Sequence, residues 1–338
     1  MPEQSAPVEV GPAPPRRWGV TIPFDAPLAD HRRLLEEVVA AGYTDVWSVE
    51  GGGADALTPL AMAAAWTSDL RLGTGVVSSF TRGPGVLAQT ASAMADVARG
   101  RFVLGIGSSS DVIVRDWNAL PFDRPYSRTR DLVRFLRAAF TGEKVSAAYE
   151  TFSVRNFRLG RPVASPPPIV VAALRERMLR LAGREADGAM VNWLSAEDVR
   201  RVSAIVRQEN PAAEVVDRIM VCPTEDTDRV RAQVKPLIAS YTAVGVYRAF
   251  HEWIGRGEAL ADSWAAWDAG DRKGAARLVP DEVVDQLVVH GSPAACRAHL
   301  RRFVESGVTT PVLALIPSGL DDVEALWALA PEPVPAGS

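Results

Sequence analysis

The carboxylate best placed for acid–base chemistry is Glu50, which ends the apolar run Asp45 to Val49 and precedes three glycines. A carboxylate beside such small residues is accessible to a substrate and can donate or accept a proton. Asp25 and Asp111 follow other apolar runs and are the alternatives for this role. Each of these carboxylates could equally cap a helix or pair with an arginine. Glu50 is therefore the candidate catalytic residue.

Two arginines offer a place for an anion. Arg175 and Arg177 fall in the first turn of an expected helix, which follows the apolar run 168–172. The helix dipole disfavours cations at this end, and a bound phosphate would offset that cost through the free N–H groups and both guanidinium groups. The simpler interpretation is that both side chains point to water.

A loop of small residues follows another apolar run. Residues 101–111 read Arg-Phe-Val-Leu-Gly-Ile-Gly-Ser-Ser-Ser-Asp, so a buried strand ends at two glycines and three serines. Small residues let a flat or anionic ligand approach the backbone N–H groups closely. As a dinucleotide motif the glycine pair is weak, because Ser110 stands where a third glycine is required. The glycines at 73 and 75 are open to two interpretations, which are approach of a ligand or tight packing inside a barrel.

Several other classes of chemistry lack the residues they need. None of the four histidines has a second ligand at metal spacing, so we expect no metal site. No serine or cysteine lies in a nucleophile elbow, which disfavours acyl transfer. The lysines are Lys144, Lys235 and Lys273, all outside the expected strands, which disfavours a Schiff-base lyase or isomerase barrel. An enzyme with so few acid–base groups usually takes its chemistry from a cofactor.

Composition sets the broad class. The 338 residues carry a net charge of -4 and are 47% hydrophobic and 23% charged, as in soluble globular proteins, with no sign of a nucleic-acid partner. No apolar stretch is long enough to span a bilayer. Cys222 and Cys296 lie far apart, and we expect reduced thiols in a cytoplasmic protein. Residues 1–17 and 331–338 are expected to be disordered, and the first segment does not resemble a signal peptide.

The elements that must position these residues alternate regularly. Strands are expected at 18–22, 45–49, 70–77, 102–106, 168–172, 188–192, 215–222 and 310–316, with helices between them. The apolar runs are continuous, which is typical of parallel strands buried on both faces. Eight strand–helix units favour an α/β fold of the TIM (β/α)8 barrel type over an open doubly wound sheet. We expect one domain over 18–330, with a hairpin near 144–159 and a helical insertion at about 226–290 that could act as a lid.

A series of short motifs resembles the bacterial luciferase-like family. In chain order they are Leu72-Gly-Thr-Gly-Val, Arg82-Gly-Pro84, Gly100-Arg-Phe-Val-Leu-Gly-Ile-Gly107, Pro168-Ile-Val-Val-Ala-Ala173, Ala186-Asp-Gly188 and Gly291-Ser-Pro293. Within that family, four segments are most similar to the branch that uses the deazaflavin coenzyme F420, namely Ser108-Ser-Ser110, Trp117-Asn118, Asn192-Trp-Leu-Ser195 and Tyr241 to Phe250.

The resemblance implies a TIM barrel with insertions that binds a flavin-like ring at its rim. It implies a bulge or a non-prolyl cis peptide behind the ring, a polar loop beside it and a phosphate loop, with Glu50 near the reactive face. The cofactor-binding residues implied are Gly75, Val76, Gly107, Ser108, Ser109, Ser110, Ala173, Leu174, Arg175, Arg177 and Asn192. Two departures stand out. Glu50-Gly51 replaces the Asp-His of many deazaflavin enzymes, and Leu174-Arg175 stands where a glycine often opens the phosphate loop.

The resulting hypothesis is an oxidoreductase that transfers a hydride between coenzyme F420 and an unidentified small organic substrate. One alternative is an FMN-dependent monooxygenase on the same barrel, and another is a non-catalytic flavin-binding relative. By analogy with the family we expect a homodimer, with no nucleic-acid or membrane partner. Five tryptophans could form an apolar pocket wall, although the last two are better explained as core; they are Trp117, Trp193, Trp253, Trp264 and Trp267.

Overall fold

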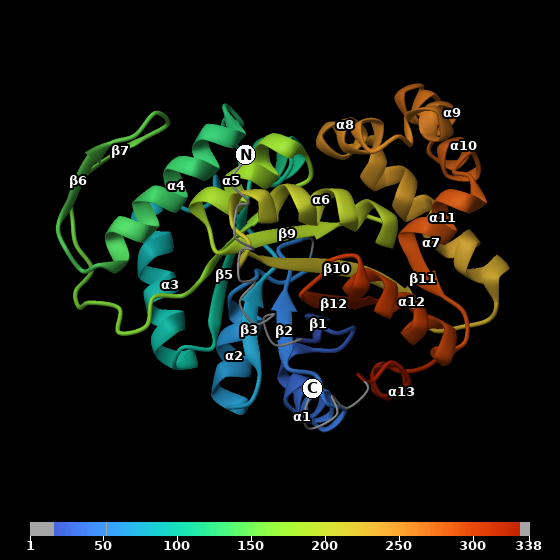
Figure 1. The fold of residues 1–338 in the computed structure, drawn as a ribbon, viewed down its shortest axis with the longest axis horizontal. Coiled ribbons are helices and arrows are strands. Elements are labelled where there is room, and N and C mark those ends of the chain that lie inside the picture. Colours follow the sequence, from blue (N-terminus) through green and yellow to red (C-terminus); the bar gives the residue numbers. More distant parts are fainter. Residues whose placement is uncertain (1–16, 52, 332–338) are drawn as a thin grey trace, which may run out of the picture.

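Eight parallel strands close into a barrel in the computed structural model, which describes residues 17–51 and 53–331 (Figure 1). Neighbours around the barrel follow chain order, and the β9–β10 and β12–β1 pairings complete the circle. The strands are β1 (Gly19–Ile22), β2 (Asp45–Ser48), β3 (Arg71–Thr74), β5 (Phe102–Gly107), β8 (Ile169–Ala172), β9 (Gly188–Asn192), β10 (Glu214–Cys222) and β12 (Thr310–Leu315). The TIM-barrel prediction is confirmed. The predicted disorder at 1–17 and 331–338 falls, except for Arg17 and Pro331, outside the described residues.

The third strand differs from its predicted form. The expected strand 70–77 is divided into β3 and a short β4 (Val77–Ser78), which pairs with β5. The two parts are separated by Gly75 and Val76, and the peptide bond between these residues is cis. The backbone therefore bends at the position where the family resemblance implies a bulge or a cis peptide.

Helices cover the outside of the barrel. They are α1 (His31–Ala40), α2 (Thr58–Trp66), α3 (Pro84–Ala98), α4 (Pro125–Phe140), α5 (Glu176–Glu185), α6 (Ala196–Glu209), α12 (Pro293–Glu305) and α13 (Asp322–Ala328). Local signals explain where several of them begin. Proline stands in the first turn of α2, α3 and α12, where its missing N–H costs nothing. A capping box of Ser195 and Asp198 starts α6.

Two excursions leave the barrel on different sides (Figure 1). One is the expected hairpin, made of β6 (Val145–Ala148) and β7 (Ser153–Phe157). The other lies between β10 and β12 and contains α7 (Thr227–Ala243), α8 (Gly245–Trp253), α9 (Gly257–Asp268), α10 (Arg272–Arg277), α11 (Asp281–Leu287) and β11 (Val288–His290). Its helices share an apolar core that reaches the barrel at Trp193 and Met220.

Strand β10 is longer than its neighbour β9, and this opens the barrel wall at one point. Residues 214–218 of β10 pair with β9, whereas β11 pairs with Met220, Val221 and Cys222. Because β12 occupies the other edge of β10, β11 takes the place of β9 beside the carboxyl end of β10. The wall beside Asn192 is therefore completed by the insertion.

The middle of the barrel is filled by the ring of Trp47, which is fully buried. It lies in a cluster with the side chains of β5, β8, β9, β10 and β12 that point inward, among them Val103, Val216 and Val312. A Cβ atom at Gly73 would overlap the Trp47 ring. For Gly73, the interpretation as tight packing is therefore correct.

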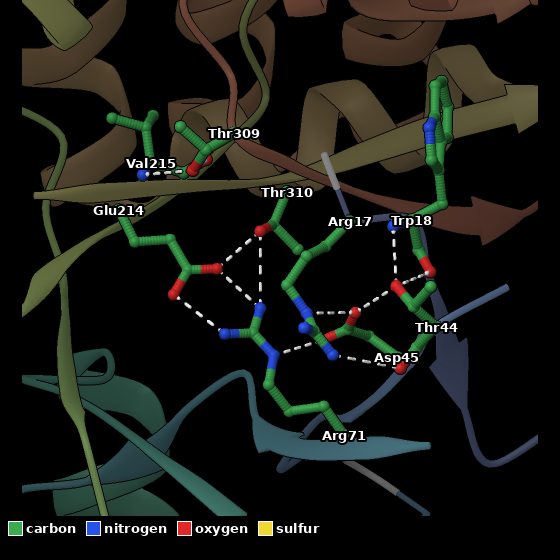
Figure 2. A network of polar contacts seen from close by, with 9 residues as sticks. All are labelled: Arg17, Trp18, Thr44, Asp45, Arg71, Glu214, Val215, Thr309 and Thr310. Atoms are coloured by element: carbon green, nitrogen blue, oxygen red, sulfur yellow. Dashed lines mark hydrogen bonds and ion pairs between the residues drawn. The ribbon is translucent and has the colours of Figure 1, made fainter. Parts of the chain in front are cut away.

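Charged residues close the amino-terminal end of the barrel (Figure 2). Arg71 of β3 forms ion pairs with Asp45 of β2 and with Glu214 of β10, while Arg17 Nε donates to Asp45 Oδ2 at 2.9 Å. Thr310 also donates to Glu214. These two cations balance the two anions, so the charges at this end are compensated without a ligand. The opposite end, at the carboxyl ends of the strands, is where TIM-barrel enzymes place their sites.

Candidate functional site

A cavity of about 1060 Å³ opens at the carboxyl ends of the strands. This volume lies at the upper end of the roughly 300–1,000 Å³ common for small-molecule pockets. The lining comes from the ends of β2, β3, β8 and β9, from Arg218 in the middle of β10, from parts of the segment 108–117, from residues 173–178, and from α7 and α8. The structure thus brings almost all predicted site residues together around one cavity, and these are Glu50, Gly75, Val76, Ser108, Ser109, Ser110, Ala173, Leu174, Arg175, Arg177 and Asn192.

The remaining predicted residue, Gly107, is buried and packs beside this lining. A Cβ atom there would lie 2.8 Å from the side chains of Val76 and Ala172. A Cβ atom at Gly105 would overlap the carbonyl oxygen of Thr74, whose hydroxyl also bonds the N–H and the carbonyl of Gly105 at 2.8 Å each. These two glycines make room for the bend between β3 and β4. Their physical role is backbone packing, and the serines that follow them are the part of the loop that faces the cavity.

The serine loop has a special backbone conformation. Ser109 has a φ of 62°, in the left-handed region that few residues other than glycine adopt. Such conformations concentrate at binding sites, where surrounding contacts hold them in place. The loop continues into a short π-helical segment, Val112–Trp117, which sequence reasoning did not predict. Ser110 starts that segment, since its hydroxyl accepts the N–H of Ile113 at 3.3 Å.

Glu50 lies in the cavity wall, but its carboxylate is already paired. Arg82 donates to both oxygens, from Nη1 at 2.9 Å and from Nη2 at 2.7 Å, and the Ser78 N–H lies 3.4 Å from Oε2. The hydrogen bonds to Glu50 raise the pKa of Arg82. A bidentate pair of this kind fixes the orientation of the carboxylate, whose remaining lone pairs can accept a hydrogen bond. The alternative carboxylates, Asp25 and Asp111, are exposed and do not line the cavity.

The amino-terminal end of α5 forms one end of the cavity. Arg175 is the N-cap residue without a side-chain cap, and its carbonyl accepts the N–H groups of Met178 and Leu179. Within the described chain, the N–H groups of residues 175–177 have no hydrogen-bond partner. The Arg177 guanidinium stacks over the ring of Tyr126 at 3.9 Å. Free amides, a positive dipole end and two arginines make a suitable place for an anion.

The charges around the cavity are unbalanced. The two carboxylates in its lining are both paired, Glu50 with Arg82 and Glu176 with Arg180 at 2.9 Å. The three arginines in the lining, Arg175, Arg177 and Arg218, have no ion pair within residues 17–51 and 53–331. A cavity with such an excess of positive charge attracts anionic ligands.

A polar group lies on the other side of the cavity. The Tyr247 hydroxyl of α8 lies 3.1 Å from Nδ2 and 3.2 Å from Oδ1 of Asn192. Burial raises the pKa of Tyr247 to about 12, so this hydroxyl stays protonated. Arg218 of β10 donates from Nε to the Thr21 hydroxyl at 3.2 Å. Sequence reasoning named Tyr247 only as part of the stretch Tyr241 to Phe250. It missed Arg218, although alternation along β10 from the inward-facing Val216 would have placed Arg218 inside the barrel.

The tryptophans divide between cavity and core. Trp117 and Trp253 line the cavity, and Trp117 is 59% exposed at its edge. Trp193 is buried and packs on Tyr241, with ring centroids 5.0 Å apart. Trp264 and Trp267 belong to the core of the insertion, as their alternative interpretation predicts.

The described residues contain no group of three histidine, cysteine, aspartate or glutamate side chains arranged to hold a metal ion. None of their helices combines the length and the apolar character needed to cross a membrane.

Comparisons with known proteins agree with this geometry. Residues 8–310 match the family model described as luciferase-like monooxygenase. A putative coenzyme F420-dependent oxidoreductase of Mycobacterium tuberculosis is 26% identical over 327 residues, which cover 88% of this chain and 92% of that protein.

Two solved structures share the fold. The coenzyme F420-dependent tetrahydromethanopterin reductase of Methanopyrus kandleri superposes with a TM-score of 0.77 at 20% identity, covering 94% of this chain and 98% of the other. The oxygenating constituent of 3,6-diketocamphane monooxygenase from Pseudomonas putida, in complex with FMN, gives 0.66 at 14% identity, covering 94% and 97%.

Proposed function

This chain belongs to the luciferase-like monooxygenase family, and from that premise we propose that it is an oxidoreductase that transfers a hydride between coenzyme F420 and a small organic substrate. One observation carries the proposal. A single cavity joins the free amino-terminal end of α5 to the bend at Gly75 and Val76, so one elongated anionic cofactor can reach both. The F420-dependent relative in Mycobacterium tuberculosis favours a deazaflavin as that cofactor.

The cofactor's phosphate fits the end of the cavity at α5. Arg175 and Arg177 supply charge there, and the backbone N–H groups of residues 175–177 supply donors that have no partner within the described chain. Stacking on Tyr126 orients Arg177 before any ligand arrives, which reduces the entropy lost on binding. Arginine therefore replaces the glycine that often opens this loop in the family.

The ring fits the opposite part of the cavity. Gly75, Val76 and Met190 provide an apolar floor, and Ser108 to Ser110 provide polar edges. When bound, the deazaflavin supplies the hydride chemistry. The protein orients the reactants and excludes water, and side chains of α7 and α8, including Tyr241 and Trp253, cover the site for that purpose.

Glu50 is the proposed catalytic residue. Its carboxylate lies at the cavity wall, and Arg82 holds it in one orientation. Held in this way, it would accept a hydrogen bond from the reacting group of the substrate and orient that group for hydride transfer. Arg82 acts on this step only through Glu50 and is a positioning residue.

An FMN-dependent monooxygenase is the second candidate, and the FMN complex of the Pseudomonas putida protein with the same fold favours it. The same phosphate-binding end would serve FMN. The non-catalytic alternative is less favourable, because a cavity of about 1060 Å³ under two covering helices is retained. A homodimer and a cytoplasmic location remain predictions, the first open to analytical ultracentrifugation.

Calorimetric titration with F420 and FMN, each oxidised and reduced, tests the proposal. We expect F420 to bind at least about tenfold more tightly than FMN, equivalent to about 1.4 kcal/mol. Micromolar binding of FMN without measurable binding of F420 would replace the proposal with the monooxygenase. If neither cofactor binds, the protein is not a flavin-type oxidoreductase.

A further inference from the structure

Arg218 occupies an unusual place inside the barrel. It lies two residues beyond Val216 on the same face of β10 and lines the cavity. Around the barrel, β10 is four strands away from β3, so Arg218 faces the bend at Gly75 and Val76 from the opposite wall. With the cofactor ring against that bend, as the proposed function has it, Arg218 would lie across the cavity from the ring, and a substrate would fit between them.

The charge of Arg218 has no counterpart in the described chain. Its contacts are the Thr21 hydroxyl, 3.2 Å from Nε, and the Met220 sulfur, 3.9 Å from Nη1. No carboxylate of the described residues comes within ion-pair distance of it. The other inward-facing arginine, Arg71, is by contrast held by both Asp45 and Glu214.

An unpaired cation in this position is costly to the fold. Arg218 is partly buried in the cavity wall, and burial lowers its pKa, but an arginine remains charged near neutral pH. A partly buried charge without a partner destabilises the folded state, and a bound anion would remove that penalty. Its contacts Thr21 and Met220 are neutral, and the neighbouring Tyr247 is a protonated phenol bonded to Asn192.

We propose that Arg218 binds a carboxylate of the substrate, so that the substrates are small organic acids held with the carboxylate toward β10 and the reacting carbon toward the cofactor. The planar fork of arginine matches a carboxylate through two parallel hydrogen bonds. The cofactor's phosphate has its own site at α5, which follows β8 on another part of the rim. This inference rests on the proposed function for the position of the ring.

The test uses the full-length protein loaded with F420, or with FMN if only FMN binds. Benzoate and its uncharged analogue benzamide are titrated separately, and the absorbance change of the bound cofactor reports binding. We expect benzoate to bind at least about tenfold more tightly than benzamide in the unmodified protein. We expect Arg218→Met to abolish that preference, Arg218→Lys to retain part of it, and cofactor affinity to stay within about threefold of the original.

A second measurement separates a binding role from a structural one. Without ligand, Arg218→Met should raise the midpoint of thermal unfolding, because it removes an uncompensated charge. A lowered midpoint in both Arg218→Met and Arg218→Lys would identify the guanidinium as a structural group and overturn the inference. Equal binding of benzoate and benzamide to the unmodified protein would also overturn it, as would a preference for benzoate that persists in Arg218→Met.

Loss of cofactor affinity in Arg218→Met would reassign Arg218 to the cofactor. Failure of F420 to bind overturns only the proposed function, since benzoate is then tested with FMN.

Discussion

At the scale of single residues, the pairing of Glu50 with Arg82 determines what chemistry the carboxylate can perform. Glu50 was predicted from its place after a strand, and Arg82 enters the site from the segment before α3. The two hydrogen bonds fix the orientation of the carboxylate. Glu50 is consequently a candidate acceptor, with its lone pairs directed by Arg82.

Replacing Glu50 with glutamine tests this role. Glu50→Gln keeps the size of the side chain but removes the negative charge, so we expect turnover to fall about a hundredfold or more. Cofactor affinity should change little, because the proposed phosphate site lies at α5. Steady-state kinetics and calorimetry measure the two effects. Glu36→Gln is a matched control, since Glu36 is exposed on α1 with only a weak i,i+4 partner. Near-normal turnover of Glu50→Gln at all pH values would show that Glu50 is structural.

The arginines at the start of α5 allow a second test. Losing a charge-assisted hydrogen bond costs roughly 1.5–3 kcal/mol, so Arg175→Ala and Arg177→Ala should each weaken cofactor binding about tenfold or more. Arg184→Ala, in the last turn of the same helix, is the matched control and should bind normally. Calorimetry gives the affinities, and circular dichroism verifies the fold. Unchanged affinity in both test variants would mean that these side chains face solvent.

At the scale of elements, the glycines of β5 fit closely against the bend between β3 and β4. Gly105 lies where a Cβ atom would overlap the Thr74 carbonyl oxygen, so any side chain there forces the backbone apart. Gly105→Ala should therefore destabilise the protein by about 3 kcal/mol, the upper end for overpacking. Gly245→Ala is the control, because a Cβ atom at Gly245 meets nothing within 4 Å. Denaturant unfolding compares the two variants. Equal stability would show that the bend can move without cost.

The strands and helices could largely be predicted from the sequence, because local patterns determine them. Continuous apolar runs such as Phe102–Gly107 are buried on both faces, and proline or capping boxes mark where helices start. The rim residues followed from these strands, since parallel strands end at one edge. Arg82 and Tyr247 could not be predicted in the same way. Their partners lie 32 and 55 residues away, so only the closed barrel brings them together.

At the scale of the whole molecule, the two ends of the barrel differ in how their charges are compensated. At the amino-terminal end, Arg17 and Arg71 are balanced by Asp45 and Glu214 (Figure 2). At the opposite end, three arginines that line the cavity have no such partners in the described chain. One end therefore contributes stability, and the other leaves its charge uncompensated at the place where this fold usually has its active site.

This division predicts how stability depends on pH. Burial acts to raise the pKa of Glu214, but the hydrogen bonds and charge of Arg71 outweigh burial, so the pKa lies below its ordinary value. A carboxylate whose pKa is lowered in the folded state stabilises the fold fully at pH values above its unfolded-state pKa of about 4.3. That stabilisation is lost as pH falls through the lower native value.

Glu214→Gln should therefore cost about 3 kcal/mol of stability at pH 7, because it leaves Arg71 partly uncompensated. The difference from the unmodified protein should shrink as the pH drops from about 5 to about 2. Urea unfolding across this range measures it, with Glu36→Gln as the exposed control. A difference that stays constant with pH would mean that packing, and not the ion pair, accounts for the role of Glu214.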